Sequence, residues 1–116
     1  MNFTDSSKFS EEIIRLQNSN KLIIVEGKKD LITLRKLEIK NIITINKPIF
    51  QIVESIKEKE VIILTDIDKT GKRLYSKLRH DLQRRGIKID NRFRNFLIQE
   101  TNLTNIEGLI KYRNKI

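Results

Sequence analysis

The chain has 116 residues and a mass of 13.8 kDa, which is enough for one core between two layers of helices but not for a second domain. It has no cysteine and a single histidine, which excludes disulfides, thiolate metal sites and histidine-rich zinc sites, so any bound metal must be held by oxygen. The net charge of +9 favours polyanionic partners, chiefly nucleic acid, although an AT-rich genome also enriches a protein in lysine.

The first half of the chain alternates helical and strand patterns. Apolar residues at helical spacing predict a helix over residues 9–17. The run KLIIV at residues 21–25 is continuously apolar and rich in β-branched residues, which is typical of a strand buried on both faces of a parallel sheet. A helix is predicted next over residues 29–38, then a second buried strand over 42–45, and then a helix that follows Pro48 and runs through Lys59.

The second half continues the alternation. A third apolar strand is predicted over residues 61–65, and a strongly amphipathic helix over 72–85. Residues 87–89 predict a fourth strand at the sheet edge and residues 91–99 a helix, whereas residues 104–112 fit no single pattern. Strands that alternate with helices favour an α/β fold, in which a mostly parallel four-stranded sheet is covered by helices on both faces. We therefore expect a three-layer α/β/α, Rossmann-like arrangement.

Acidic residues follow two of the predicted strands. Glu26 comes directly after the first strand, and Asp66 and Asp68 come after the third. Functional groups of open parallel sheets gather at the carboxyl ends of the strands, so these acids can converge if the two strands are neighbours. Two carboxylates with one residue between them repel each other unless a cation intervenes, and Mg²⁺ prefers such hard oxygen ligands. The pattern predicts a Mg²⁺ site, with Mn²⁺ as a substitute, although Asp68 also stands where it could cap a helix.

Glycines and cations flank these acids. Gly27 and Gly71 would allow tight turns that bring the backbone close to a phosphate. Lys28 and Lys29 stand near a helix start, where a phosphate would arrive, although lysines in such positions are commonly just solvated. The helix over residues 72–85 begins beside the acids and is rich in basic residues. Its candidates for contact with a nucleic-acid backbone are Lys72, Arg73 and Lys77, although such cations can also be simply the solvated face of the helix.

Two segments resemble the signature motifs of a known family. VEGKKD at residues 25–30 and TDIDKTG at residues 65–71 look like the two motifs of the Toprim family, in their order, spacing and strand context. That family is shared by topoisomerases, bacterial-type primases, OLD-family nucleases, recombination-repair proteins and the ribonuclease that matures 5S ribosomal RNA. The chain length and the segment NIEGL at residues 105–109 resemble the small stand-alone Toprim proteins of archaea.

The resemblance implies a fold and a set of roles. Glu26 would act as general acid or base, and Asp66 and Asp68 would hold Mg²⁺, while Asp30 matches a motif position that carries no definite role. The fold would be a Toprim fold.

The domain limits follow from the same motifs. One Toprim domain is expected over residues 1–116, with its core at about 21–90, a leading helix at about 9–19 and a C-terminal helical segment at about 91–116. The N-terminus has no secretory or transit pattern, and no apolar stretch approaches the length of a membrane span. We therefore expect a cytoplasmic protein that has no membrane partner.

Three functions compete for this pattern. The first is a magnesium-dependent nuclease that acts on the phosphodiester bonds of RNA or DNA. Such a nuclease could take part in RNA processing together with other proteins that process nucleic acid. The second is a nucleic-acid-binding accessory subunit that does not catalyse and whose metal site is vestigial or structural. The third interprets DIDKT at residues 66–70 as the start of a haloacid-dehalogenase-type phosphatase. That family has the motif on its first strand and needs more chain after it, which disfavours the phosphatase. We favour the nuclease over the accessory subunit, because a Toprim domain without a domain that carries a tyrosine nucleophile is best suited to activate water against a phosphodiester.

Overall fold

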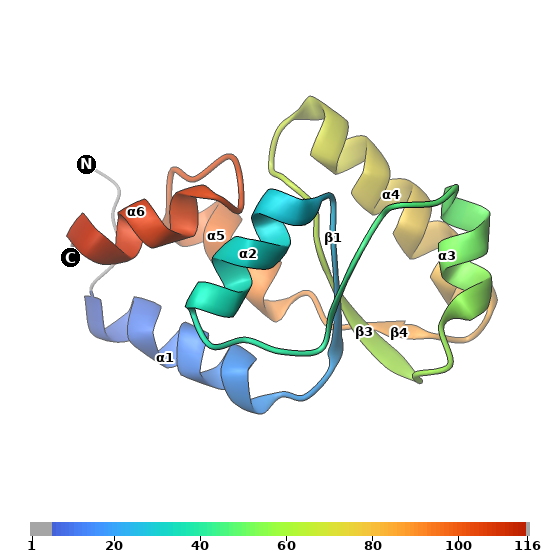
Figure 1. Cartoon of the computed structure of the whole chain (residues 1–116), viewed down its shortest axis with the longest axis horizontal. Coiled ribbons are helices and arrows are strands. Elements are labelled where there is room, and N and C mark those ends of the chain that lie inside the picture. Colours follow the sequence, from blue (N-terminus) through green and yellow to red (C-terminus); the bar gives the residue numbers. More distant parts are fainter. Residues whose placement is uncertain (1–5, 116) are drawn as a thin grey trace.

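The structure, a computed structural model, describes the backbone of residues 6–115 and the side chains of residues 7–111. Its helices and strands alternate along the chain (Figure 1). The elements are α1 (Ser6–Asn18), β1 (Leu22–Val25), α2 (Lys28–Lys36), β2 (Ile42–Thr44), α3 (Ile49–Ser55), β3 (Glu60–Leu64), α4 (Lys69–Arg84), β4 (Lys88–Ile89), α5 (Arg92–Glu100) and α6 (Gly108–Lys115).

The four strands form one sheet in the order β2-β1-β3-β4, and each neighbouring pair is parallel. The predicted α/β fold is confirmed, with a sheet that is parallel throughout the described residues rather than mostly parallel. β1 and β3 lie next to each other, with Ile23 opposite Ile62 and Val25 opposite Leu64. Both strands therefore end at the same level, and the loops after them begin at one edge of the sheet.

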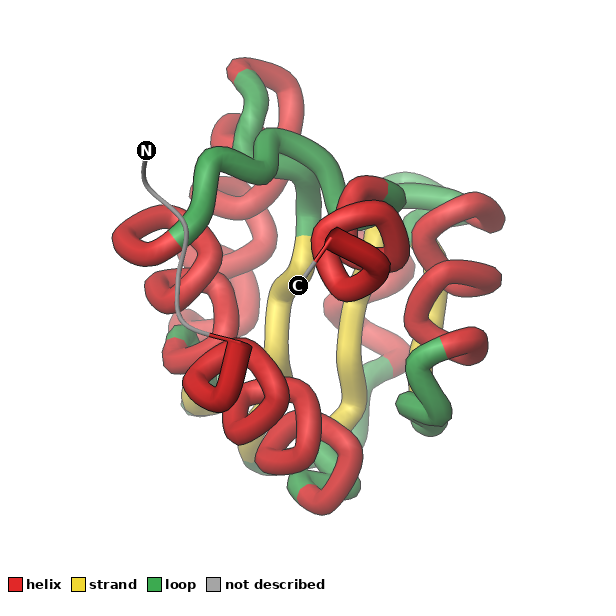
Figure 2. Tube along the Cα trace, turned by 90° about the vertical axis from the view of Figure 1, so that its left-hand side faces the viewer, coloured by secondary structure: helices red, strands yellow, loops and turns green. Residues whose placement is uncertain are grey.

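The sheet separates two apolar cores, because successive side chains of a strand point to opposite faces. Ile23 and Val25 of β1 pack on the side covered by α1, α2, α5 and α6. Leu22 and Ile24 pack on the side covered by α3 and α4. Figure 1 shows these two helical layers to the left and right of the strands, and Figure 2 looks through the left-hand layer onto the sheet. The three-layer arrangement is thereby confirmed.

Some element ends differ from their predicted positions. α3 ends at Ser55 and not at Lys59, because Ile56 adopts an extended backbone and inserts its side chain into the core, where 2% of it is exposed. α4 begins at Lys69, three residues before the predicted start, because the Asp68 side chain caps the helix. The leading helix begins earlier than predicted and covers Ser6–Asn18.

The predicted C-terminal helical segment consists of α5 and α6 joined by a loop over residues 101–107. This loop returns to the carboxyl edge of the sheet, where the Ile67 N–H donates a hydrogen bond of 2.8 Å to the Thr104 carbonyl. We call residues 101–107 the return loop. The sequence pattern did not predict it, because its contacts are made with residues about 40 positions earlier in the chain.

No helix within residues 6–115 is both long enough and apolar enough to cross a membrane. The predicted domain limits, residues 1 and 116, lie outside the described part of the chain. A single domain over residues 1–116 and a cytoplasmic location stay predictions.

Candidate metal centre

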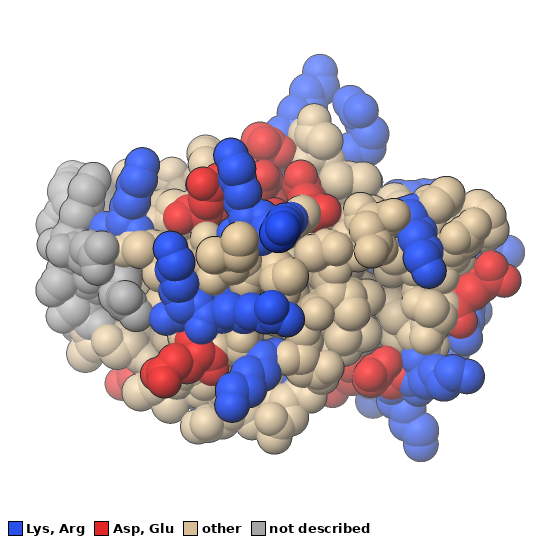
Figure 3. Space-filling model, viewed as in Figure 1, with Lys and Arg blue, Asp and Glu red and all other residues tan. Residues whose placement is uncertain are grey.

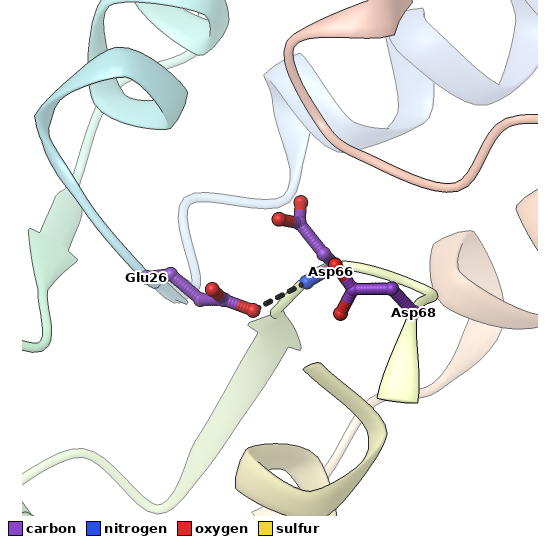
Figure 4. Close-up of side chains that lie close together, drawn as sticks. All are labelled: Glu26, Asp66 and Asp68. Atoms are coloured by element: carbon purple, nitrogen blue, oxygen red, sulfur yellow. Dashed lines mark hydrogen bonds between the residues drawn. The ribbon is translucent and has the colours of Figure 1, made fainter. Parts of the chain in front are cut away.

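Three carboxylates converge at the carboxyl edge of the sheet. Glu26 follows β1, and Asp66 and Asp68 follow β3, so the two adjacent parallel strands deliver them to the same place (Figure 4). One oxygen of each carboxylate lies within 4.8 Å of an oxygen of the other two. The predicted convergence of these acids is therefore what the structure shows, and we call the three residues the acidic centre.

Each carboxylate of the acidic centre accepts one backbone hydrogen bond. Glu26 Oε1 accepts from the Asp66 N–H at 3.0 Å and Asp66 Oδ1 accepts from the Ile106 N–H at 2.9 Å. Asp68 Oδ1 accepts from the Gly71 N–H at 2.7 Å, which is the helix cap of α4. The second oxygen of each carboxylate accepts no hydrogen bond from a described residue. A set of hard oxygen donors at this spacing, with free lone pairs, fits a divalent cation that prefers oxygen ligands.

Burial and mutual repulsion disfavour the charged forms of Glu26 and Asp66. Desolvation raises the pKa of Glu26, and the negative charges of Asp66 and Asp68 raise it further. Desolvation is also the main cause of the raised pKa of Asp66, ahead of the charges of Asp68 and Glu107, while the Ile106 N–H and Arg94 act in the opposite direction. Without a cation the acidic centre is therefore a source of electrostatic strain, and a bound cation would relieve it.

The Asp66→Asn variant is expected to melt at a higher temperature than the wild type in metal-free buffer at neutral pH. The amide still offers an oxygen to the Ile106 N–H, but it removes a charge that its surroundings disfavour. Because the folded-state pKa of Asp66 is raised, the wild type gains stability as the pH falls through that pKa, whereas the variant does not. The difference in melting temperature should therefore shrink as the pH falls toward 3.8, the ordinary aspartate pKa. A variant that melts below the wild type at every pH would contradict this account.

Asp30 holds the loop that carries Glu26. Its side chain is 8% exposed, and Oδ2 accepts the Gly27 N–H at 3.2 Å, which closes the first turn of α2 around the end of β1. Desolvation raises the pKa of Asp30, and Asp66 and Glu107 add to this. Asp30, whose motif position implied no definite role, thus has a structural contact next to the acidic centre. It lies outside the set of three carboxylates.

Gly71 packs directly against the Asp66 backbone. A Cβ at this position would overlap the Asp66 carbonyl oxygen, so the first turn of α4 can lie this close to β3 because residue 71 has no side chain. The Thr65 hydroxyl donates a 2.7 Å hydrogen bond to the Gly71 carbonyl across the same gap. Gly27 differs, since a Cβ there would meet nothing within 4 Å. That either glycine approaches a phosphate stays a prediction.

Arg94 of α5 lies next to the acidic centre, and no pattern in the sequence predicts this position for it. Its side chain is 3% exposed, and its guanidinium donates to the Thr65 carbonyl and hydroxyl and, at 3.1 Å, to the Asp66 carbonyl. The guanidinium carbon also lies 4.4 Å from the centre of the Tyr75 ring, which stacks against it. Arg94 therefore fixes the two carbonyls at the end of β3, from which Asp66 projects.

The return loop completes the centre from the other side. Its Ile106 N–H binds the Asp66 carboxylate, and the exposed Glu107 beside it raises the pKa values of Asp30 and Asp66 through its charge. Both residues belong to the segment NIEGL, whose resemblance to small stand-alone Toprim proteins implied no role for it. The contribution of Ile106 comes from its backbone, so no side-chain pattern could have indicated it.

The five predicted phosphate-contacting cations are exposed and lie outside the acidic centre. Figure 3 shows acidic side chains gathered at the upper edge of the molecule, with lysine and arginine side chains on both sides of them. Lys77 forms an ion pair of 3.1 Å with Asp81 on the same helix. The exposed cations at the start of α2 and along α4 are Lys28, Lys29, Lys72, Arg73 and Lys77.

A parallel α/β sheet that gathers oxygen ligands at the carboxyl ends of two adjacent strands defines a class of metal-binding α/β proteins. The family model of the Toprim domain matches residues 20–91 of this chain, and the chain belongs to the Toprim family. Toprim proteins bind divalent metal and act on nucleic acid. The resemblance of the two motifs to the Toprim family is confirmed.

Curated relatives and a solved structure agree with this assignment. The chain is 35% identical over 111 residues to a UPF0292 protein of Methanocaldococcus jannaschii, and the match covers 90% of this chain and 87% of the relative. It is 36% identical over 113 residues to a UPF0292 protein of Pyrococcus abyssi, with 92% and 86% covered. The structure of a putative protein from Aquifex aeolicus matches with a TM-score of 0.78 at 37% identity, over 84% of this chain and 94% of that chain.

Proposed function

We propose that this protein is a magnesium-dependent nuclease that hydrolyses phosphodiester bonds of RNA or DNA. The observation that carries the proposal is the convergence of Glu26, Asp66 and Asp68 within 4.8 Å at the carboxyl edge of the sheet. Two aspartates with free carboxylate oxygens suit a Mg²⁺ or Mn²⁺ ion that also binds substrate phosphate. A divalent metal there would supply Lewis-acid polarisation of a phosphate oxygen.

Glu26 is the residue in this centre best suited to move a proton. Its pKa is raised by burial and by the charges of the two aspartates. A general acid or base works best when its pKa lies near the working pH, and the raised pKa moves Glu26 in that direction. Oε1 is held by the Asp66 N–H, so the side chain is oriented while its other oxygen stays free. We therefore assign to Glu26 the general acid or base at the attacking or leaving oxygen, and to Asp66 and Asp68 the metal ligands.

The test is an incubation of the purified protein with labelled single- and double-stranded RNA and DNA, with Mg²⁺, with Mn²⁺ and with a chelator. We expect cleavage that requires the metal. Binding without cleavage under every condition would reject the nuclease and support the accessory subunit, whose nucleic-acid contacts need only the exposed cations. Cleavage that persists in the chelator would remove the acidic centre from the reaction.

The double variant Arg73→Gln/Lys77→Gln is expected to weaken binding to unrelated sequences and to flatten its salt dependence. Both side chains lie exposed on α4, which starts beside the acidic centre. Each lost phosphate contact should reduce the slope of log affinity against log salt by about 0.7–0.9. Fluorescence anisotropy across a salt series measures this slope.

The matched control is Lys57→Gln/Lys59→Gln, which removes the same charge from exposed positions before β3, at the opposite edge of the sheet. It should change affinity and slope less than the α4 variant. Equal effects of both variants would mean that net charge, rather than the α4 surface, attracts the nucleic acid.

A further inference from the structure

α4 carries a line of cations away from the acidic centre. Arg73, Lys77 and Arg84 are separated by four and seven residues, which places them on the same side of the helix. Because a helix rises about 1.5 Å per residue, Lys77 lies about 14 Å and Arg84 about 24 Å along the axis from Asp68. We call these three residues the basic stripe. Arg84 forms no ion pair with any described residue, so its charge is available to a ligand.

The far end of the basic stripe meets an exposed aromatic ring. α3 packs beside α4 (Figure 1), and Phe50 of α3 has 60% of its surface exposed, although its neighbours Ile52 and Val53 are buried. An open groove of about 360 Å³ lies between the two helices. It is lined by Phe50, Val53, Glu54, Lys77, Asp81 and Arg84, together with the backbone-bound Arg85.

The charges of this groove favour a neutral, flat ligand beside Phe50. Lys77 is paired with Asp81 in an exposed ion pair, which is weak enough for a phosphate outside the groove to compete with Asp81. The Arg85 guanidinium donates to the carbonyls of Val53 and Ile56, so Arg85 is not available to a phosphate. Arg84 remains as the one groove cation that pairs with no described residue. Glu54, which also pairs with none, adds a negative charge that disfavours a phosphate inside the groove. A nucleobase offers an uncharged π-face for the phenyl ring, and the phosphate attached to it would carry the charge that Arg84 attracts.

We infer that Phe50 and the groove between α3 and α4 form a stacking site for an unpaired nucleobase, so that the substrate has a single-stranded stretch about 14–24 Å along α4 from the acidic centre. The inference rests on the proposed function and names its substrate class. A paired base inside a duplex is already stacked on its neighbours and cannot lie on the Phe50 ring. The basic stripe joins the two sites, because one strand can follow it from the acidic centre to the groove.

The chain contains no tryptophan, so a single introduced tryptophan reports on its own position. The variant Phe50→Trp places an indole at the stacking site, and Ile98→Trp is the matched control on α5 in the opposite layer, where Ile98 is 50% exposed. In metal-free buffer, which prevents cleavage, unpaired DNA and RNA oligonucleotides should quench the Phe50→Trp fluorescence saturably. The duplexes should quench it far less, and the Ile98→Trp fluorescence should hardly change.

The affinity measurement completes the test. Loss of one stacked base should lower the affinity of the Phe50→Ala variant for single strands by about 5- to 150-fold and leave duplex binding nearly unchanged. The stacking site is wrong if nucleic acid does not quench the Phe50→Trp fluorescence and Phe50→Ala binds single strands with wild-type affinity. Cleavage by the wild type would still support the nuclease in that case. A wild type that binds no nucleic acid would overturn the proposed function instead. Fluorescence that shifts with protein concentration alone would overturn the stacking site in favour of a protein contact.

Discussion

The Glu26→Gln variant is expected to keep its fold and most of its metal affinity but to lose turnover by ~10²–10⁴-fold. The amide retains an oxygen for the Asp66 N–H, so the loop after β1 stays in place, whereas the proton-exchanging group is gone. The loss should appear in the single-turnover cleavage rate at saturating substrate, and Mn²⁺ titration should show that the metal still binds. Cleavage at the wild-type rate would remove Glu26 from the proposed mechanism.

Glu107→Gln provides the control for this variant. Glu107 is an exposed acid of the return loop whose charge acts on Asp30 and Asp66, but it does not belong to the three converging carboxylates. Its neutralisation removes the same charge from the neighbourhood of the centre. A turnover loss as large as that of Glu26→Gln would mean that the total negative charge, rather than the position of the Glu26 carboxylate, governs the rate.

The Arg94→Lys variant is expected to bind Mn²⁺ about 10- to 100-fold more weakly than the wild type, which is the usual effect of removing a group that orients metal ligands. The guanidinium bridges the Thr65 and Asp66 carbonyls, and a lysine ammonium cannot span both while it also stacks on Tyr75. Because the positive charge is kept, the change tests geometry and not electrostatics. Electron paramagnetic resonance of free Mn²⁺ measures the affinity without any need for cleavage.

Arg85→Lys is the matched control, since its guanidinium also donates to two backbone carbonyls, those of Val53 and Ile56, but far along α4 from the acidic centre. Both variants should lose some thermal stability, and only Arg94→Lys should lose metal affinity. Titrations are therefore made well below the melting temperature of each variant. An unchanged Mn²⁺ affinity in folded Arg94→Lys would show that Arg94 supports the fold alone.

The parts of the fold that were predicted correctly are those encoded by short-range patterns. β1 and β3 are continuous apolar runs because both of their faces are buried, and such runs stand out in a sequence. The acids that follow them could be assigned to one sheet edge. Their convergence depended on β1 and β3 being neighbours, which periodicity does not encode and the strand order now establishes.

The parts that were not predicted depend on tertiary contacts. Ile56 looked like a continuation of α3, and its insertion into the core between α3 and β3 ends the helix earlier. Arg94 stands beside Phe93 and two residues before Phe96, where a single sequence offers no sign that the cation is buried with them. Its partners, Thr65 and Asp66, lie nearly 30 positions away. Single-sequence reasoning therefore locates charged ligands more easily than the groups that hold them.

The return loop affects how this centre could be transplanted into another protein. The segment that matches the Toprim model ends at residue 91, and it contains all three converging acids. The Arg94 guanidinium, the Thr104 carbonyl and the Ile106 N–H all come from beyond it. A chimaera that received residues 20–91 alone would inherit the ligands without their supports, so a graft should extend through at least residue 109, the last residue of the NIEGL segment.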